Sequence, residues 1–176
     1  MQSNREVFEK MSVPKALATL AAPTIVSQII TMVYNLADTV FIGSTNDPSK
    51  VAASSVAFVL VFAMNCLSNL FGVGGGSLIS RLMGEKKDKD AKGVASFSFY
   101  GSLAISLVYS LVVWACMDPF LRFLGATDSS IGYAVDYTGW VIILGAVPST
   151  LAMTMSHLLR SEGYATHASV GLGMGG

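Results

Sequence analysis

Charged residues are scarce in this chain. Only 12% of its 176 residues are Asp, Glu, Lys or Arg, while 52% are hydrophobic. A soluble domain carries about 25% charged residues, so the composition excludes an ordinary soluble protein and predicts a membrane protein. The eleven acidic and eleven basic residues cancel. Net charge therefore gives no indication of a nucleic-acid or acidic partner, and we expect no nucleic-acid partner.

Cysteine and catalytic groupings are nearly absent too. Cys66 and Cys116 lie in apolar runs without CxxC or CxxH spacing, so we expect two buried free thiols and neither a disulfide nor a metal site. No nucleophile–base pair and no paired carboxylates occur within the apolar runs. We therefore expect no enzyme, no catalytic residue and no cofactor. The first eighteen residues lack an apolar core and a cleavage site, which argues against a cleaved signal peptide.

Long apolar runs are what the chain has instead. A helix of about 20 apolar residues crosses the roughly 30 Å hydrocarbon core of a bilayer. We predict an all-α polytopic membrane protein with a leader (1–16), four transmembrane helices (17–42, 51–79, 93–116 and 131–159), a charged loop (80–92), a second loop with a short interfacial helix (117–130) and the start of a fifth span (168–176). Since the last run is too short to cross a bilayer as a helix, we expect the chain to stop within a span.

The distribution of basic residues predicts the orientation in the membrane. Three precede the first span and five lie between spans two and three, whereas the opposite connections carry one each: Arg5, Lys10 and Lys15; Arg81, Lys86, Lys87, Lys89 and Lys92; Lys50; and Arg122. The positive-inside rule then places the N-terminus and the 80–92 loop in the cytoplasm. We expect a multi-pass protein of the inner or plasma membrane.

A polar stripe runs along the first span. Thr24, Gln28, Thr31, Asn35 and Asp38 recur at steps of three and four residues, which places them on one face of a helix. A carboxylate within a span usually faces a protein interior or a wet cavity and marks an ion or substrate path. We therefore predict a functional role for Asp38. The hydroxyls and amides either line the same cavity or join this helix to its neighbours.

The second span carries a comparable stripe. It consists of Asn65, Ser68, Asn69, Gly72, Gly76 and Ser80. Gly72 and Gly76 form a GxxxG pattern, which predicts close packing of another helix. The surrounding GVGGGS resembles a phosphate-binding loop, but no strand precedes it and no Lys-Ser/Thr pair follows. Asn65 and Asn69 are candidate cavity-lining residues, or helix contacts.

Three stretches resemble the MATE (multidrug and toxic compound extrusion) transporters: YNLADTVFIG, GVGGGSLISRLMGEKKDKDA and LLRSEGYATHA. The resemblance implies the N-terminal part of a twelve-helix, two-lobed fold that exports cationic, amphipathic compounds in exchange for protons or sodium. It also implies an ion-coupling role for Asp38, accompanied by Tyr34 one turn earlier; Asn35 belongs to the same polar stripe. The family's partner amide or acid on the fifth span would lie beyond Gly176. Transport would then need further helices or a companion chain.

Two alternatives stay open. The first is a flippase for lipid-linked oligosaccharides from the same superfamily, which would need cationic residues to hold pyrophosphate. The sequence places no Lys or Arg inside a span, because Arg160 falls in the polar turn 160–167, and this favours a cationic substrate. The second is a truncated, non-transporting membrane subunit, suggested by the abrupt end in GLGMGG.

Overall fold

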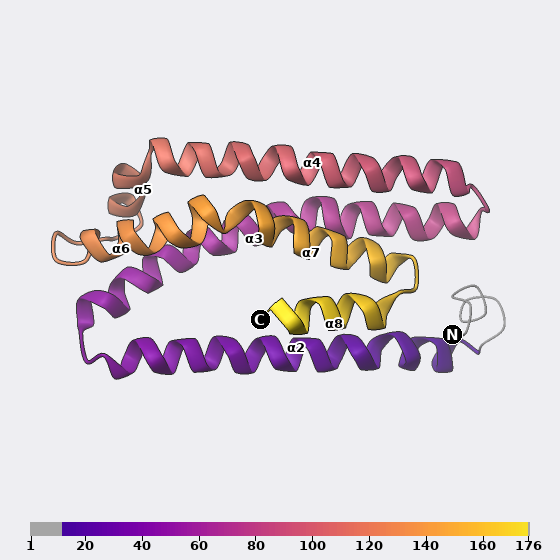
Figure 1. The fold of residues 1–176 in the computed structure, drawn as a ribbon, viewed down its shortest axis with the longest axis horizontal. Helices are drawn as coiled ribbons and strands as arrows, with labels where there is room; N and C mark the ends of the chain where they lie inside the picture. Colours follow the sequence, from indigo (N-terminus) through magenta and orange to yellow (C-terminus); the bar gives the residue numbers. More distant parts are fainter. Residues whose placement is uncertain (1–11, 176) are drawn as a thin grey trace.

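The structure, a computed structural model, describes residues 12–175, apart from the side chains of residues 16, 20 and 172–175. Its elements are α2 (Val13–Ser44), α3 (Pro48–Gly84), α4 (Asp88–Ala115), α5 (Met117–Phe123), α6 (Ile131–Thr138), the π-helix η1 (Gly139–Leu144), α7 (Ala146–Ser161) and α8 (Ala165–Gly175) (Figure 1). The described part of the chain contains no β-strand. The predicted all-α fold is therefore confirmed.

Three helices are long and apolar enough to cross a membrane. They are α2, α3 and α4, and a fourth span results if α6 and η1 are counted together with α7, from which they are bent by 50°. The fold is therefore that of a multi-pass membrane protein.

The helices run further than the apolar runs predicted. Helix α3 has 37 residues, about 55 Å at 1.5 Å per residue, which exceeds a hydrocarbon core of about 30 Å. Because α4 begins at Asp88, the predicted 80–92 loop shrinks to the turn 85–87. Hydropathy indicates where a helix leaves the lipid, but the backbone hydrogen bonds of the helix can continue beyond that point into water. The helices are therefore longer than their apolar runs.

The short turn between α3 and α4 contains an ion pair between Lys87 and Glu85. Lys87 Nζ donates to Glu85 Oε2 at 2.7 Å, and this bond lowers the pKa of the Glu85 carboxyl and raises the pKa of the Lys87 ammonium. Asp88 and Asp90 lie in the first turn of α4, where carboxylates interact favourably with the helix dipole.

The remaining predicted boundaries are also shifted. Most of the predicted leader lies outside the described residues, but residues 13–16 belong to α2, which begins with a proline in its first turn, a position that proline favours. The interfacial helix expected within 117–130 is present as α5. Helix α8 begins at Ala165, three residues before the predicted fifth span.

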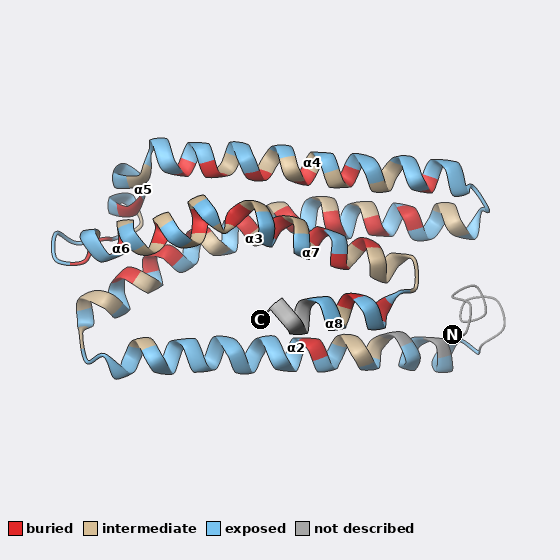
Figure 2. Cartoon of the chain, viewed as in Figure 1, coloured by how far each residue is buried: buried red, intermediate tan, exposed pale blue. Residues whose placement is uncertain are grey.

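A bundle of α3, α4 and the broken α6–η1–α7 helix forms the core. Helix α2 lies along one side of this bundle, and α8 folds back between α2 and α7 (Figure 1). Figure 2 shows buried residues on the facing sides of the bundle helices, while α2 is exposed over most of its length. The main buried cluster includes Leu60, Met64, Val113, Leu121 and Ile142.

The predicted GxxxG contact is confirmed as packing between α3 and α7. A Cβ atom added at residue 72 would lie 2.9 Å from Cδ2 of His157 and 3.2 Å from its Cβ, and one added at residue 76 would lie 3.3 Å from Cβ of Ser161. The two helices are joined further by Ser68 Oγ, which donates to the Thr150 carbonyl at 3.2 Å. The two helices can therefore pack this closely because Gly72 and Gly76 have no side chains.

The fourth span is broken near its middle. Pro148 lies in the first turn of α7 and lacks the N–H that would bond back to residue 144, while the π-helix η1 shifts the hydrogen-bond register before it. A Cβ at Gly145 would clash with the Val141 carbonyl oxygen. Ser110 Oγ of α4 donates to the Ile143 carbonyl at 3.2 Å. A neighbouring helix thus satisfies a carbonyl at the break, as a lipid environment requires.

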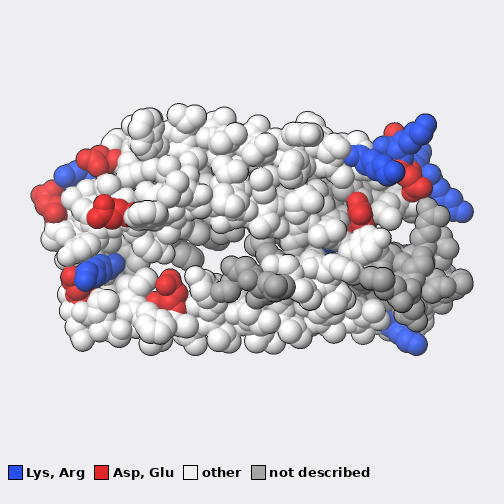
Figure 3. Space-filling view, in the orientation of Figure 1, with Lys and Arg blue, Asp and Glu red and all other residues white. Residues whose placement is uncertain are grey.

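Charges gather at the two ends of the molecule (Figure 3). We define the basic end as the end with the α3–α4 turn, which carries Arg81, Lys86, Lys87, Lys89 and Lys92. The opposite end, with the α2–α3 turn and α5, carries two ion pairs, Lys50–Asp47 at 3.9 Å and Arg122–Asp128 at 2.8 Å. The surface between the ends is almost free of charge in this view.

The two cysteines differ from the prediction. Cys66 and Cys116 are free, as expected, but both are exposed rather than buried. Apolar character predicted burial against protein. In a membrane protein an apolar helix face also suits contact with lipid.

Candidate ion-coupling and substrate site

The polar stripe of α2 faces the bundle. Ser27 is buried, at 4% exposure, and Thr31, Tyr34 and Asp38 follow it by four, seven and eleven residues, which puts all four on one helix face. Thr31 Oγ1 donates to the Ser27 carbonyl at 3.0 Å. Since Ser27 itself contacts Arg160 of α7, this face looks toward the bundle.

The stretch of α2 beyond Ser27 is nevertheless uncovered. Every residue from Gln28 to Phe41 is exposed, including Asn35 and Asp38. In the space-filling view, openings remain between the row of atoms formed by α2 and the bundle (Figure 3). The stripe therefore forms one wall of an open space rather than a packed helix contact.

Tyr137 of α6 lies within electrostatic range of this wall. Its half-buried phenol interacts electrostatically with both Asp38 and Tyr34. The structure thus places a tyrosine that the sequence analysis missed within electrostatic range of Asp38 and Tyr34, two of the three predicted ion-coupling residues. The sequence could have identified Tyr137 from its expected depth in the membrane. Tyr137 lies near the start of the fourth predicted span and Asp38 near the end of the first, so the two residues lie at similar depth if these helices are antiparallel.

The candidate residues of the second span lie apart from this group. Asn65 is half-buried, and its amide donates to the Val61 carbonyl of its own helix at 3.1 Å. Asn69 is exposed. Among the described residues, neither amide forms a hydrogen bond with α2. Their predicted cavity-lining role therefore stays a prediction.

Arg160 is not in the turn where the sequence placed it. It lies in the last turn of α7, and its Nη2 donates to Ser27 Oγ at 3.3 Å, well inside the predicted first span. The side chain is half-buried, and its Nε has no partner among the described residues. Helix α7 thus continues past the apolar run, and the cation near its end reaches a serine of the first predicted span. The expectation that no Lys or Arg lies inside a span stays a prediction.

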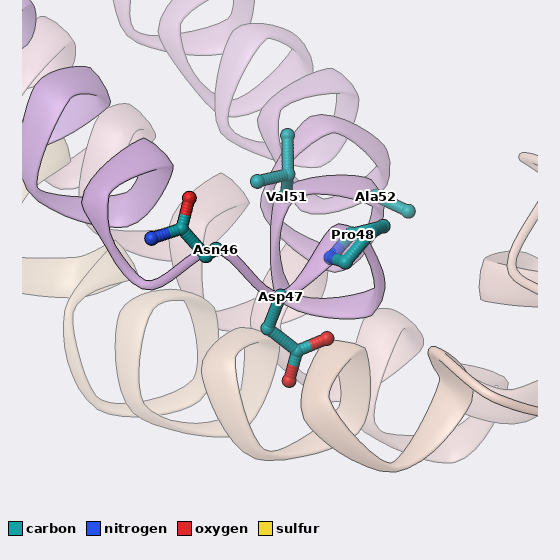
Figure 4. Close-up of a pocket in the computed structure, with 5 residues that line it drawn as sticks. All are labelled: Asn46, Asp47, Pro48, Val51 and Ala52. Atoms are coloured by element: carbon teal, nitrogen blue, oxygen red, sulfur yellow. The ribbon is translucent and has the colours of Figure 1, made fainter.

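A hollow of about 480 Å³ lies at the α2–α3 turn, lined by Asn46, Asp47, Pro48, Val51 and Ala52 (Figure 4). It contains none of the predicted site residues. The Asp47 carboxylate accepts from the Ser49 backbone N–H at 3.0 Å and so caps α3. These groups serve the turn, and we assign them no binding role.

The chemistry of the open space is that of a single carboxylate among neutral oxygen groups. Asp38 offers an anionic oxygen, Tyr34 and Tyr137 offer phenols, and Asn35 offers an amide. Within residues 12–175, no cluster of three His, Cys, Asp or Glu side chains suited to a metal ion occurs. Such a set can hold a proton or one small hard cation, because carboxylate and carbonyl oxygens suit both.

Comparison with known sequences gives a consistent family. The sequence profile of MatE matches residues 23–172. The chain is 30% identical over 165 residues to the multidrug export protein MepA of Staphylococcus saprophyticus and 31% identical to that of Staphylococcus aureus, covering 94% of this chain in each case. The chain spans about 36% of the length of these curated relatives.

A solved structure shares the fold. It is that of a MOP superfamily transporter from Pyrococcus furiosus, described as having a reversed binding-pocket polarity that suggests a different function. The match has a TM-score of 0.89 and 24% identity and covers 99% of this chain and 38% of the other.

Proposed function

Because the chain belongs to the MatE family, we propose that it forms part of a cation-coupled antiporter that exports cationic, amphipathic drugs or metabolites. The observation that carries the proposal is the position of Asp38, an intramembrane carboxylate on the wall of an open space. Intramembrane carboxylates in such positions mark ion and substrate paths. The names of the multidrug export relatives support the export of drugs.

Competition for one carboxylate couples the two fluxes. When Asp38 is ionised, its charge attracts either the coupling cation or a cationic substrate. When Asp38 binds a proton or a sodium ion, that charge is neutralised and the substrate is released. Tyr34, Asn35 and Tyr137 supply neutral oxygens that hold the bound cation. Because these ligands suit both ions, we propose proton or sodium as the coupling ion without choosing between them.

The basic end defines the orientation in this proposal. Positively charged connections favour the cytoplasm, so we assign the basic end to that side. The open space around Asp38 then lies in the outer half of the membrane, and the buried Ser27 lies in the inner half. This arrangement suits a state that exchanges ions and substrate with the outside.

The remaining walls of the site must come from elsewhere. The Gln28–Phe41 face of α2 is exposed, and a transporter that alternates between two sides needs a second group of helices to move against the first. We propose that further helices or a companion chain supply them, within the lipid bilayer.

Replacement of Asp38 tests the proposal. Asp38→Asn keeps the shape of the side chain and removes its charge, so coupled efflux should be lost while membrane insertion is unchanged. Asp136→Asn is the matched control, because it removes a carboxylate from the exposed face of α6. The measurement is ion-driven efflux of a fluorescent organic cation from cells or vesicles. Full efflux by Asp38→Asn would refute the proposal.

A lipid-linked oligosaccharide flippase is the second candidate. The observation in its favour is Arg160, a half-buried cation that contacts α2 at Ser27. A pyrophosphate is held by several charge-assisted bonds, and one guanidinium bonded to a serine supplies few of them. Export of cations therefore remains the first proposal. Transport of a lipid-linked sugar with no efflux of organic cations would reverse this order.

A further inference from the structure

We propose that Arg160 is a positioning residue that closes the inner half of the transport path by fastening α2 to α7. This inference builds on the proposed transporter function and adds a role for a residue outside the Asp38 site. In the closed arrangement the guanidinium bonds to Ser27, and the bond breaks when the basic end opens.

The contact joins elements that otherwise hardly meet. Arg160 Nη2 donates to Ser27 Oγ at 3.3 Å, across 133 residues of sequence. Helix α2 makes most of its contacts with α8 and few with α3. The hydrogen bond is therefore a direct side-chain link between α2 and the bundle in the inner half.

Burial along α2 changes at the same place. Ser27 is 4% exposed, whereas Tyr34, seven residues further along the same face, is 54% exposed. Helix α8 runs beside the covered part (Figure 1). The Arg160–Ser27 bond thus lies at the one buried position among the described side chains of α2, immediately before the exposed stretch Gln28–Phe41.

The chemistry of the bond suits a contact that breaks and re-forms. Ser27 Oγ is a neutral acceptor and also donates to the Thr24 carbonyl of its own helix at 2.9 Å, so α2 stays intact without Arg160. The guanidinium is half-buried and gains hydration if the inner half opens. Breaking a bond to a carboxylate at this depth would leave two charges unpaired, whereas breaking this bond leaves one.

Cysteine labelling from the cytoplasmic side tests the proposal. The reporter is Ser169→Cys on α8, because the hydroxyl at this position is buried without a partner among the described residues. Cys66→Ala and Cys116→Ala remove the two native thiols. The protein is expressed in its native form and studied in inside-out membrane vesicles. The probe is a membrane-impermeant maleimide.

A matched pair of serine variants isolates the bond. Ser27→Ala removes the acceptor of Arg160, whereas Ser102→Ala removes a buried serine on α4 whose hydroxyl makes the same local bond, to the Phe99 carbonyl at 2.9 Å. A hydrogen bond to a charged group shifts an equilibrium by about tenfold. We expect Ser27→Ala to raise the labelling rate by about this factor and Ser102→Ala to leave it unchanged.

Arg160→Gln provides a second route to the same result. It should also raise the labelling rate, and combining it with Ser27→Ala should add little, because both remove one bond. Monodispersity after detergent extraction separates opening from misfolding. Equal labelling of the Ser27→Ala and Ser102→Ala proteins would overturn the proposal, as would labelling that rises additively in the double variant.

The outcome is separable from that of the proposed function. Asp38→Asn in the same reporter background tests efflux, while the labelling rate tests the closure. If Asp38→Asn transports normally, the coupling proposal fails, yet a labelling difference between the two serine variants still establishes the contact with Arg160. If efflux depends on Asp38 but labelling does not depend on Ser27, only the positioning role of Arg160 is refuted.

Discussion

Replacing Gly72 by alanine tests how closely α3 and α7 must approach. The new Cβ would lie 2.9 Å from Cδ2 and 3.2 Å from Cβ of His157. The ring can rotate, but Cβ is fixed to the α7 backbone, so the two helices must separate slightly. Overpacking of this kind costs about 1–3 kcal/mol, while alanine in place of glycine within a helix regains about 1 kcal/mol.

Gly74 provides the control for this change. It lies on the same helix, and a Cβ added there meets nothing within 4 Å. Because the gain in helix propensity is the same at both positions, the difference between the two alanine variants isolates the clash. We expect Gly72→Ala to be about 1–3 kcal/mol less stable than Gly74→Ala.

Unfolding of the purified protein in detergent measures this difference. Thermal or denaturant curves of the two variants are compared under one condition, and Gly72→Ala should unfold first. Equal midpoints would mean that α7 does not pack on Gly72 as described. A more stable Gly72→Ala protein would refute the close approach of these helices altogether.

Three further results are expected. Tyr137→Phe should slow coupled efflux several-fold, because it removes the hydroxyl that lies within electrostatic range of Asp38 and Tyr34. The control Tyr133→Phe alters an exposed tyrosine of the same helix, and equal efflux rates would contradict a role for Tyr137. Ser110→Ala should cost about 1–3 kcal/mol of stability, because it removes the hydroxyl that donates to the Ile143 carbonyl. Ser106→Ala, whose hydroxyl donates to the Leu103 carbonyl of its own helix, should cost less, and unfolding midpoints in the opposite order would argue against the Ser110 bond. Cys66 and Cys116, both exposed, should react with a lipid-soluble maleimide in native membranes, and protection of either thiol from labelling would show that another segment covers it.

Sequence patterns that depend on one helix alone were read correctly. The apolar runs predicted long helices in these segments, since the cost of leaving backbone groups unpaired in lipid admits only helices there, and the described residues include three helices long and apolar enough to cross a membrane. The three-and-four spacing of the α2 stripe placed Thr31 and Asp38 on one face, because helical periodicity is local. The glycines at positions 72 and 76 predicted a close helix contact for the same reason.

Contacts that depend on how one helix packs against another could not be predicted from the sequence. The partners of Gly72 and Ser110 lie in α7 and η1, and no spacing along the chain specifies them. Helix α3 ends at Gly84 and α4 begins at Asp88, beyond the predicted span ends at 79 and 93. Hydropathy reports the lipid boundary and not the end of helical hydrogen bonding.

The sequence by itself determined the class of protein, the number of apolar runs and the acid on which the proposed mechanism depends. Composition and periodicity suffice for these, since each is a property of a residue and its near neighbours. Only the tertiary structure decided that Tyr137 lies within electrostatic range of Asp38 and that Arg160 reaches Ser27. Those pairings arise from how α6 and α7 bend and pack against α2. The bend follows from the π-helix and the proline together with the neighbours that satisfy the freed carbonyls.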